Sequence, residues 1–390
     1  MSGKDLTVEQ QFDQSILGSN LQRVLVMRPD TIGDVIMLSP ALRALREALP
    51  HSEITLITSE SGSQVTPLLS GIDHVIVYPE VWQDVTESSL LNLRKNIGFL
   101  ERLRSQQFSL ALIFTSVQQS PFPAAYACYL AGIPYRVGLA QKPTSSALSH
   151  FLPPPAEDVH QVDRNLKLLE ALNISGASNE LALTIPEDVA RRANELLMEN
   201  GITRDVPYIV LAPGASVACN QYAPKYFAAV AHLLAAQSER QLVIVGDSEA
   251  AHRIQPVLQV ADENLYGNVH SLVGKTTIPE LAAVIRQANL TISNKSASMH
   301  IAEAFHCPMI ALYPRTDKID SWRPRNTSTR LLCRPARCSL CHSTSCPYGM
   351  KCLDIRPEEV AVAALEMLAD QTYEPTPYSV LQVKGEILYS

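Results

Sequence analysis

The sequence is 390 residues long, enough for about two or three domains that each bury their own core. Its 46% hydrophobic and 18% charged content is that of an ordinary globular protein, and its net charge of −7 argues against a general nucleic-acid binder, because phosphate-backbone binding needs a basic surface. No apolar run approaches the roughly 18 residues of a membrane span, and residues 1–20 lack the features of a secretory signal. We therefore expect a cytoplasmic protein whose contact with the inner face of the membrane, if any, is peripheral.

The first half of the chain alternates short β-branched runs with amphipathic stretches, a pattern typical of βα units that build a parallel sheet. The predicted strands are Val24–Met27, Ile54–Thr58, Val75–Tyr78 and Leu110–Phe114. The predicted helices lie near residues 35–49, 89–105, 122–131 and 162–172. We expect a flexible tail at residues 1–20 and a Rossmann-like domain at residues 21–172.

The second half repeats this scheme after residues 173–206, which we interpret as a linker region. The predicted strands are Tyr208–Ala212, Leu242–Val245, Leu290–Ser293 and Met309–Leu312. The predicted helices lie near residues 224–236, 248–259, 277–288 and 298–305. A second Rossmann-like domain at residues 207–370 and a C-terminal tail at 371–390 follow, so the fold class is α/β with two Rossmann-like domains.

The loops that follow the strands are the candidate sites, because ligands of open α/β sheets bind beyond the carboxyl ends of the strands. Asp34 stands at the turn between the first strand and its helix. Its carboxylate can be a charge partner of the helix N-terminus or a general base that faces a cleft. The turn lacks the GxGxxG pattern of dinucleotide-binding proteins, with Gly33 its only glycine, which argues against an oxidoreductase.

Two loops of the second half are suited to an anion. Residues 213–216 (Pro-Gly-Ala-Ser) follow a strand and offer backbone N–H groups and a hydroxyl. Residues 294–300 (Asn-Lys-Ser-Ala-Ser-Met-His) follow another strand and open a helix, whose N-terminal dipole favours a diphosphate. His300 falls in the first turn of that helix and can be either a ligand contact or a structural histidine.

The stretch Gly274-Lys275-Thr276 is not a phosphate-binding P-loop, because Val269 stands where that motif requires a glycine. Thr277 and Glu280 instead predict a capping box at the start of a helix.

These motifs together resemble those of glycosyltransferase family 9, the heptosyltransferases that use ADP-heptose to build lipopolysaccharide. The similarity extends from about residue 22 to 369. The residues that carry it are Gly33-Asp34 and Pro40, Pro213–Ser216, Leu272–Thr276, Asn294–Ala302, Thr316-Asp317 and Trp322–Pro324.

The resemblance implies a GT-B fold, with two Rossmann-like domains facing across an interdomain cleft. It implies an N-terminal acceptor domain, a C-terminal domain that holds the sugar-nucleotide donor, and inversion at the anomeric carbon with Asp34 as the general base. Arg28, Gly33 and Arg136 are the candidate acceptor-binding residues. The candidate donor-binding residues are Gly214, Ala215, Ser216, Asn220, Lys275, Asn294, Lys295, Ser296, Ala297, His300, Arg315 and Thr316.

The chain departs from the family pattern at the donor loops. Lys295 and Ala297 stand where the family usually has Asp and Gly, and Asn220 replaces a common phosphate-contacting lysine. As a hypothesis, Lys295 and Arg315 supply the diphosphate charge that Asn220 cannot.

Cysteines cluster near the end of the second domain. Cys338, Cys341, Cys346 and Cys352 fall within a short, proline-containing stretch at residues 333–352. In a cytoplasmic protein this density favours a structural zinc or iron ion over reduced thiols, and either over disulfides. Some family members look similar here, and relatives that modify autotransporters hold iron at such a cysteine finger.

We expect an inverting glycosyltransferase that transfers heptose from ADP-heptose to a lipopolysaccharide core or another cell-envelope glycan. No cofactor is expected in catalysis, and no nucleic acid as a partner. The alternatives are a protein O-heptosyltransferase with a metal-binding cysteine loop, a GT-B-like binding protein without transferase activity, and a metal-dependent regulatory or assembly module.

Overall fold

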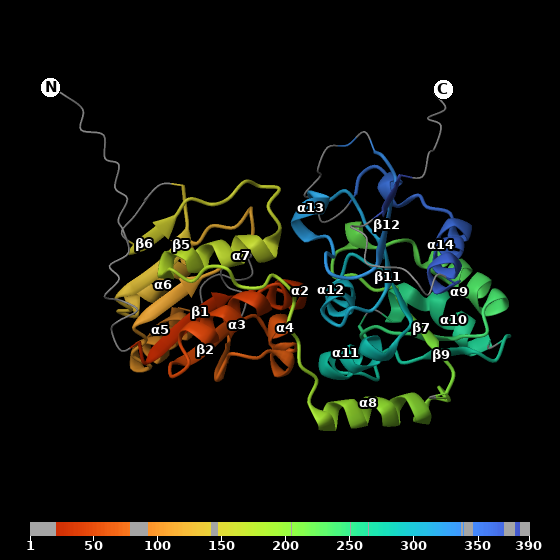
Figure 1. The fold of residues 1–390 in the computed structure, drawn as a ribbon, viewed down its shortest axis with the longest axis horizontal. Helices are drawn as coiled ribbons and strands as arrows, with labels where there is room; N and C mark the ends of the chain where they lie inside the picture. The colour runs from red at the N-terminus through yellow and green to blue at the C-terminus, as the bar shows by residue number, and fades with distance from the viewer. Residues whose placement is uncertain are drawn as a thin grey trace. The chain divides into compact units, whose positions relative to one another are not determined.

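The computed structural model describes residues 21–78, 93–141, 147–203, 205–249, 251–263, 265–336, 338, 346–369 and 379–382. The chain divides into two compact units, Met1–Asn179 and Glu180–Ser390, each built around its own sheet (Figure 1). No helix of the described residues is long and apolar enough to cross a bilayer.

The first unit contains a parallel six-stranded sheet with the order β3-β2-β1-β4-β5-β6. Its strands are β1 (Arg23–Arg28), β2 (Glu53–Thr58), β3 (His74–Val77), β4 (Leu110–Ile113), β5 (Tyr135–Leu139) and β6 (His150–Leu152). All four residues of β4, Leu-Ala-Leu-Ile, are buried, because helices cover both faces of a parallel sheet.

The helices of the first unit are α2 (Ile32–Ile36), α3 (Ser39–Ala48), α4 (Glu60–Ser63), α5 (Leu93–Ser105), α6 (Phe122–Leu130) and α7 (Gln161–Leu169), with short 3-10 turns at Thr66–Leu68 and Glu170–Leu172. The single helix expected near residues 35–49 is two helices, α2 and α3. Pro40 explains the break, because its ring nitrogen has no hydrogen to bond the preceding turn and fits only the first turn of a new helix.

The second unit contains a parallel seven-stranded sheet with the order β13-β12-β11-β10-β7-β8-β9. Its strands are β7 (Tyr208–Ala212), β8 (Gln241–Ile244), β9 (Val269–Ser271), β10 (Leu290–Asn294), β11 (Met309–Leu312), β12 (Thr329–Cys333) and β13 (Ser379–Gln382). The strand β13 lies within the segment that the sequence assigned to a C-terminal tail.

The helices of the second unit are α8 (Glu187–Glu199), α9 (Pro224–Gln237), α10 (Gln255–Glu263), α11 (Ile278–Gln287), α12 (Ala297–Ala304), α13 (Ile319–Trp322) and α14 (Pro357–Ala369), with 3-10 turns at Ala218–Asn220, Ala251–Ile254 and Lys351–Leu353. The helix α8 lies within residues 173–206, the expected linker, and packs against α11. The apolar faces of α9, α10 and α14 pack on the sheet and form the core of this unit.

Each sheet has a topological switch point, where successive strands are added in opposite directions. In the first unit it lies between β1 and β4, and in the second between β7 and β10. Loops at the carboxyl ends of strands on either side of a switch point diverge and leave room for a ligand. The turn that carries Asp34 follows β1, and residues 213–216 and 295–296 follow β7 and β10.

Candidate active site

Arg28 organises the switch point of the first unit. It is the last residue of β1, its side chain is 0% exposed, and it pairs with two carboxylates. Its Nε lies 3.1 Å from Asp30 Oδ2, and its Nη2 donates to Asp34 Oδ1 at 2.8 Å. A buried guanidinium needs such compensation, because an unpaired buried charge is very costly.

The carboxylate of Asp34 is fixed at both oxygens yet remains accessible. Oδ1 accepts from Arg28, and Oδ2 accepts from the Thr31 hydroxyl at 2.6 Å. The Asp34 side chain is 17% exposed, in contrast to the buried Asp30. An oriented, partly exposed carboxylate can accept a proton from a bound hydroxyl, which is the requirement for a general base.

Two residues after β4 complete this site, Ser116 and Gln119, neither of which is among the predicted site residues. Ser116 Oγ accepts from Arg28 Nη2 at 2.8 Å and lies 3.5 Å from Asp34 Oδ1. Gln119 Nε2 donates to Asp30 Oδ1 at 2.6 Å. The available signal was position: both residues follow the strand next to β1, at the same edge of the sheet.

Asn294 holds the loops of the second unit together. Its side chain is buried, its amide nitrogen donates to the Pro213 carbonyl at 2.8 Å, and its oxygen accepts from the Tyr222 N–H at 2.9 Å. Thr316 Oγ1 donates to Asn220 Oδ1 at 3.2 Å. The polar atoms of Asn294 are therefore hydrogen-bonded within the protein. This supports a role in positioning the loops, rather than direct contact with the sugar nucleotide.

Residues 214–216, Lys295 and Ser296 are at least partly exposed beside these loops, although the Ser296 hydroxyl oxygen is buried. Lys295 forms an ion pair with Asp317, and its ammonium lies 5.6 Å from the ring centre of Tyr313 and 5.7 Å from that of Trp322. Burial and the negative charge of Asp317 raise the pKa of the Tyr313 hydroxyl well above its usual range. The Lys295 charge is thus offset within the protein, which weakens the hypothesis that it replaces a missing phosphate contact.

Arg136 and Lys275 make contacts away from these clusters, whereas His300 lies beside the Trp322 ring that Lys295 also approaches. Arg136 is buried, and its guanidinium donates to the carbonyls of Ala147, Ile133 and Pro134, which supports a structural role in β5.

Lys275 Nζ donates to Asn200 Oδ1 at 2.5 Å, beyond β9 at the edge of the sheet. His300 is buried, with Nδ1 4.0 Å from Glu303 Oε2 and its ring 6.4 Å from that of Trp322.

The described cysteines of the cluster are unpaired. Cys338 and Cys346 are partly exposed and Cys352 is buried, whereas Cys341 lies outside the described residues. Two backbone N–H groups, of Tyr348 and Met350, point at Cys346 Sγ at 3.4 Å. Within the described part of the chain, no three metal-ligating side chains are gathered in a geometry that holds a metal ion.

The isolated cysteines are packing residues. Burial raises the pKa of the Cys128 thiol to about 12 and that of Cys307 to about 11. Cys219 is buried as well.

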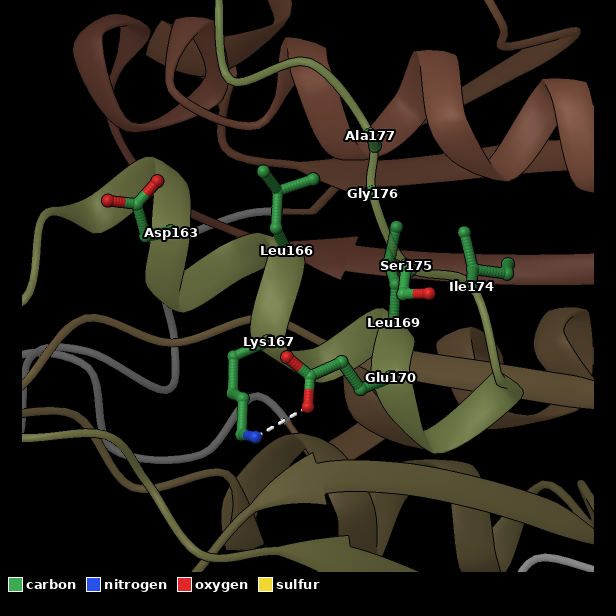
Figure 2. A pocket seen from close by; sticks show the side chains of 9 residues that line it. All are labelled: Asp163, Leu166, Lys167, Leu169, Glu170, Ile174, Ser175, Gly176 and Ala177. Atoms are coloured by element: carbon green, nitrogen blue, oxygen red, sulfur yellow. Dashed lines mark hydrogen bonds and ion pairs between the residues drawn. The ribbon is translucent and has the colours of Figure 1, made fainter.

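A surface pocket lies along α7 of the first unit. Figure 2 shows its lining along α7, the 3-10 turn that follows it and the irregular segment 174–177, with the Lys167–Glu170 ion pair, which measures 2.5 Å. The lining residues are Asp163, Leu166, Lys167, Leu169, Glu170, Ile174, Ser175, Gly176 and Ala177. None of them is a predicted site residue.

The chain matches the model of glycosyltransferase family 9 (heptosyltransferase) over residues 97–351, more than half of its length. The protein belongs to this family. The resemblance drawn from the loop motifs is thereby confirmed, and the protein is a glycosyltransferase.

Known members of the family resemble this glycosyltransferase over most of its length. It is 26% identical to lipooligosaccharide heptosyltransferase 2 of Campylobacter jejuni (serotype O:6) over 344 residues, 87% of this chain and 96% of the relative. It is 23% identical to lipopolysaccharide heptosyltransferase 3 of Escherichia coli (strain K12) over 299 residues, 75% of this chain and 82% of the relative.

Solved structures share the fold of the glycosyltransferase. A family 9 glycosyltransferase of Veillonella parvula superposes with a TM-score of 0.73 at 22% identity, covering 90% of this chain and 98% of the other. The ADP-heptose lipopolysaccharide heptosyltransferase II of E. coli gives 0.70 at 18% identity, covering 90% and 100%. The iron-containing dodecameric glycosyltransferase TibC of enterotoxigenic E. coli gives 0.50 at 12% identity, covering 90% and 77%. The predicted GT-B class of the two α/β units is confirmed.

Proposed function

We propose that this glycosyltransferase transfers heptose from ADP-heptose to a lipopolysaccharide core or another cell-envelope glycan, with inversion and with Asp34 as the general base. The observation that carries the proposal is the geometry of Asp34. Its carboxylate lies at the switch point of the first unit, is oriented by Arg28 and Thr31, and stays partly exposed. Direct displacement at the anomeric carbon needs one such base on the acceptor hydroxyl.

The second unit supports the donor half of this proposal. Residues 214–216 after β7 offer backbone N–H groups. Ser296 stands at the N-cap position of α12 without a side-chain capping hydrogen bond, and the dipole at this helix N-terminus favours a diphosphate. Arg315 is partly exposed in the loop after β11 and contributes positive charge to the departing diphosphate. The names of the relatives, which include an ADP-heptose transferase, favour ADP-heptose among nucleotide sugars.

Calorimetric titration of the purified protein with ADP-heptose, ADP-glucose, GDP-mannose and UDP-N-acetylglucosamine tests the donor. We expect selective binding of ADP-heptose. Selective binding of another donor would overturn the heptose assignment while leaving the transferase, and no binding at all would favour a GT-B-like protein without transferase activity.

The acceptor class has one competing candidate, a protein hydroxyl as in O-heptosylation, because the cysteine stretch invites comparison with TibC. Incubation with labelled ADP-heptose and either heptose-deficient lipopolysaccharide or unmodified autotransporter protein separates the two. The proposed function predicts label in the lipopolysaccharide. It also places the enzyme in the cytoplasm, where nucleotide sugars are made, with peripheral contact at the membrane that presents the acceptor.

We also propose that Cys338, Cys341, Cys346 and Cys352 hold a structural zinc or iron ion. The support is chemical: Cys338 and Cys346 lie close enough to Cys352 to raise the pKa of its thiol beyond the effect of burial, and N–H donors to a sulfur favour a thiolate. When bound, the metal would fix the loop between β12 and α14.

Elemental analysis of protein purified without added metal tests the metal site. About one zinc or iron per chain, lost in Cys346→Ser together with a lower melting temperature, is the expected result. Metal-free protein whose stability does not change in Cys346→Ser would overturn it.

A further inference from the structure

A second arginine adjoins the Arg28 cluster. Arg164 lies in the first turn of α7, is 5% exposed, and donates from Nε to the Thr115 carbonyl at 3.1 Å. The next residue, Ser116, accepts from Arg28 and lies 3.5 Å from Asp34. Two guanidinium groups therefore flank the same pair of residues after β4, beside the carboxylate proposed as the base.

The two arginines differ in their charge partners. Arg28 pairs with Asp30 and Asp34. Within the described residues Arg164 pairs with no carboxylate, and its hydrogen bond comes from Nε. Its two terminal nitrogens are not among the fully buried unsatisfied atoms, so they are accessible to a ligand. Burial, and then the positive charge of Arg28, lower the pKa of Arg164. This cation is thus held where desolvation and a like charge both oppose it.

Other buried polar atoms at the same place also lack partners within the described residues. They are Nη1 of Arg28, whose side chain is completely buried, and Oγ1 of Thr115, whose carbonyl accepts from Arg164. Such orphan donors are rare, since an unsatisfied buried polar group costs about 1 to 3 kcal/mol. These unsatisfied polar atoms, together with an Arg164 cation that no carboxylate pairs within the described residues, favour the binding of an anionic oxygen group at this point.

We propose that Arg164 is an acceptor-binding residue: its terminal nitrogens bind an anionic group of the acceptor, a carboxylate or a phosphate, next to the hydroxyl that Asp34 activates. This inference rests on the proposed function and deepens it by assigning an acidic acceptor. A guanidinium presents two parallel N–H donors that match the oxygens of either group, which favours arginine over lysine here. Arg164 also takes over the role that the sequence assigned to Arg136, whose guanidinium is used by backbone carbonyls.

A purely structural role for Arg164 would consist of holding the Thr115 carbonyl, and the chain contains a matched control for it. Gln161 donates to the same carbonyl from Nε2 at 3.3 Å and is uncharged. Loss of the Gln161 hydrogen bond perturbs the loop without removing a cation. An effect of Arg164 that Gln161 does not share therefore arises from its charge.

The test is calorimetric titration of the full-length protein with inorganic phosphate and, separately, with acetate, at constant ionic strength and in the presence of excess ADP. The wild-type protein, Arg164→Met and Gln161→Met are compared. We expect Arg164→Met to bind at least one of the two anions about tenfold more weakly, the usual effect of losing a charge-assisted hydrogen bond, and Gln161→Met to bind like the wild type. The anion that binds more tightly to the wild type identifies the acidic group.

Three results would each overturn the proposal. The wild type and Arg164→Met could bind the anions with equal affinity, both variants could lose affinity equally, or the wild type could bind neither anion. If Arg164→Met does not fold, Arg164→Gln replaces it, since it keeps a donor to Thr115. If ADP does not bind, the proposed donor is wrong. The comparison of anion binding between the variants concerns the first unit alone, so failure of the proposed function and failure of the Arg164 proposal are distinguishable.

Discussion

At the residue scale, the network around Asp34 shows how far a sequence can be interpreted. Asp34 was predicted from its place between a strand and a helix, because the carboxyl edge of a sheet is a local property of the chain. Two of its neighbours were not predicted: Ser116 and Arg164 are 82 and 130 residues away in the sequence. The pairing of β1 with β4 brings Ser116 close, and the packing of α7 against α3 and β5 brings Arg164 close. Arg136 illustrates the same limit, since nothing local reveals which carbonyls surround a guanidinium.

Gly62 allows α4 to approach the Arg28 cluster, and its replacement gives the first prediction. A Cβ at Gly62 would lie 2.2 Å from Thr58 Oγ1 and 2.5 Å from the Asp30 carbonyl oxygen. Gly62→Ala should therefore lower the free energy of unfolding by about 1 to 3 kcal/mol, as overpacking does, in urea denaturation. Gly98→Ala is the control, because a Cβ there meets nothing within 4 Å and it lies in α5. It should raise stability by about 0.5 to 1 kcal/mol; equal effects of the two variants would contradict this account.

At the scale of elements, the central strands and the edge strand β3 were predicted almost to the residue, and the other outer strands were missed. Strands such as β4 are short apolar runs buried on both faces, a signal that sequence alone carries. The strands β6 and β9 are three residues long, and β5 contains an arginine and a glycine, so their existence depends on the neighbouring strand. Whether residues near a sheet edge form a strand depends on their pairing with the neighbouring strand, and no local sequence pattern encodes that pairing.

The capping box at the start of α11 was predicted from sequence and is present: the Thr277 hydroxyl accepts from the Glu280 N–H, and the Glu280 carboxylate accepts from the Thr277 N–H at 2.7 Å. Thr277→Ala should lower the free energy of unfolding by about 1 kcal/mol, measured by urea denaturation. Thr276→Ala, one residue earlier, should change stability by less than about 0.5 kcal/mol. A Thr277→Ala protein as stable as Thr276→Ala would show that the cap does not contribute.

Glu359 joins the start of α14 to the end of β12, and it predicts a pH dependence. Burial alone would raise the pKa of Glu359, but hydrogen bonds from Arg356 and the charges of Arg334 and Arg356 lower it below the ordinary value of 4.5. A carboxylate with a lowered pKa in the folded state stabilises the protein above its unfolded pKa, and this stabilisation is lost as the pH falls through the folded pKa.

Glu359→Gln should therefore melt at a lower temperature than the wild type at pH 7, by an amount equivalent to about 1 to 2 kcal/mol, and the difference should shrink as the pH falls below about 4. Thermal melts across this range measure it. Glu366→Gln is the control, because the Glu366 carboxylate that pairs with Arg330 is 58% exposed and such pairs contribute little. A constant difference at every pH would contradict the charge account of Glu359.

At the scale of the whole molecule, each unit carries one candidate site at the switch point of its own sheet. The proposed function divides the work between them, with the base in the first unit and the donor loops in the second. Substitutions in the two units should then have separable effects.

Gly214 offers a clean change in the second unit, because a Cβ there meets nothing within 4 Å and the fold tolerates a side chain. Gly214→Val should cover the backbone N–H groups after β7 and weaken ADP binding by about tenfold.

The most direct test of the central claim is to measure, for Asp34→Asn and the wild type, both the affinity for ADP and the rate of heptose transfer to heptose-deficient lipopolysaccharide. Asparagine keeps the size of the side chain and loses the basic oxygen. Our account predicts that ADP affinity is unchanged and that the transfer rate falls by about a hundredfold or more. An Asp34→Asn protein that transfers heptose at the wild-type rate would contradict the assignment of the base.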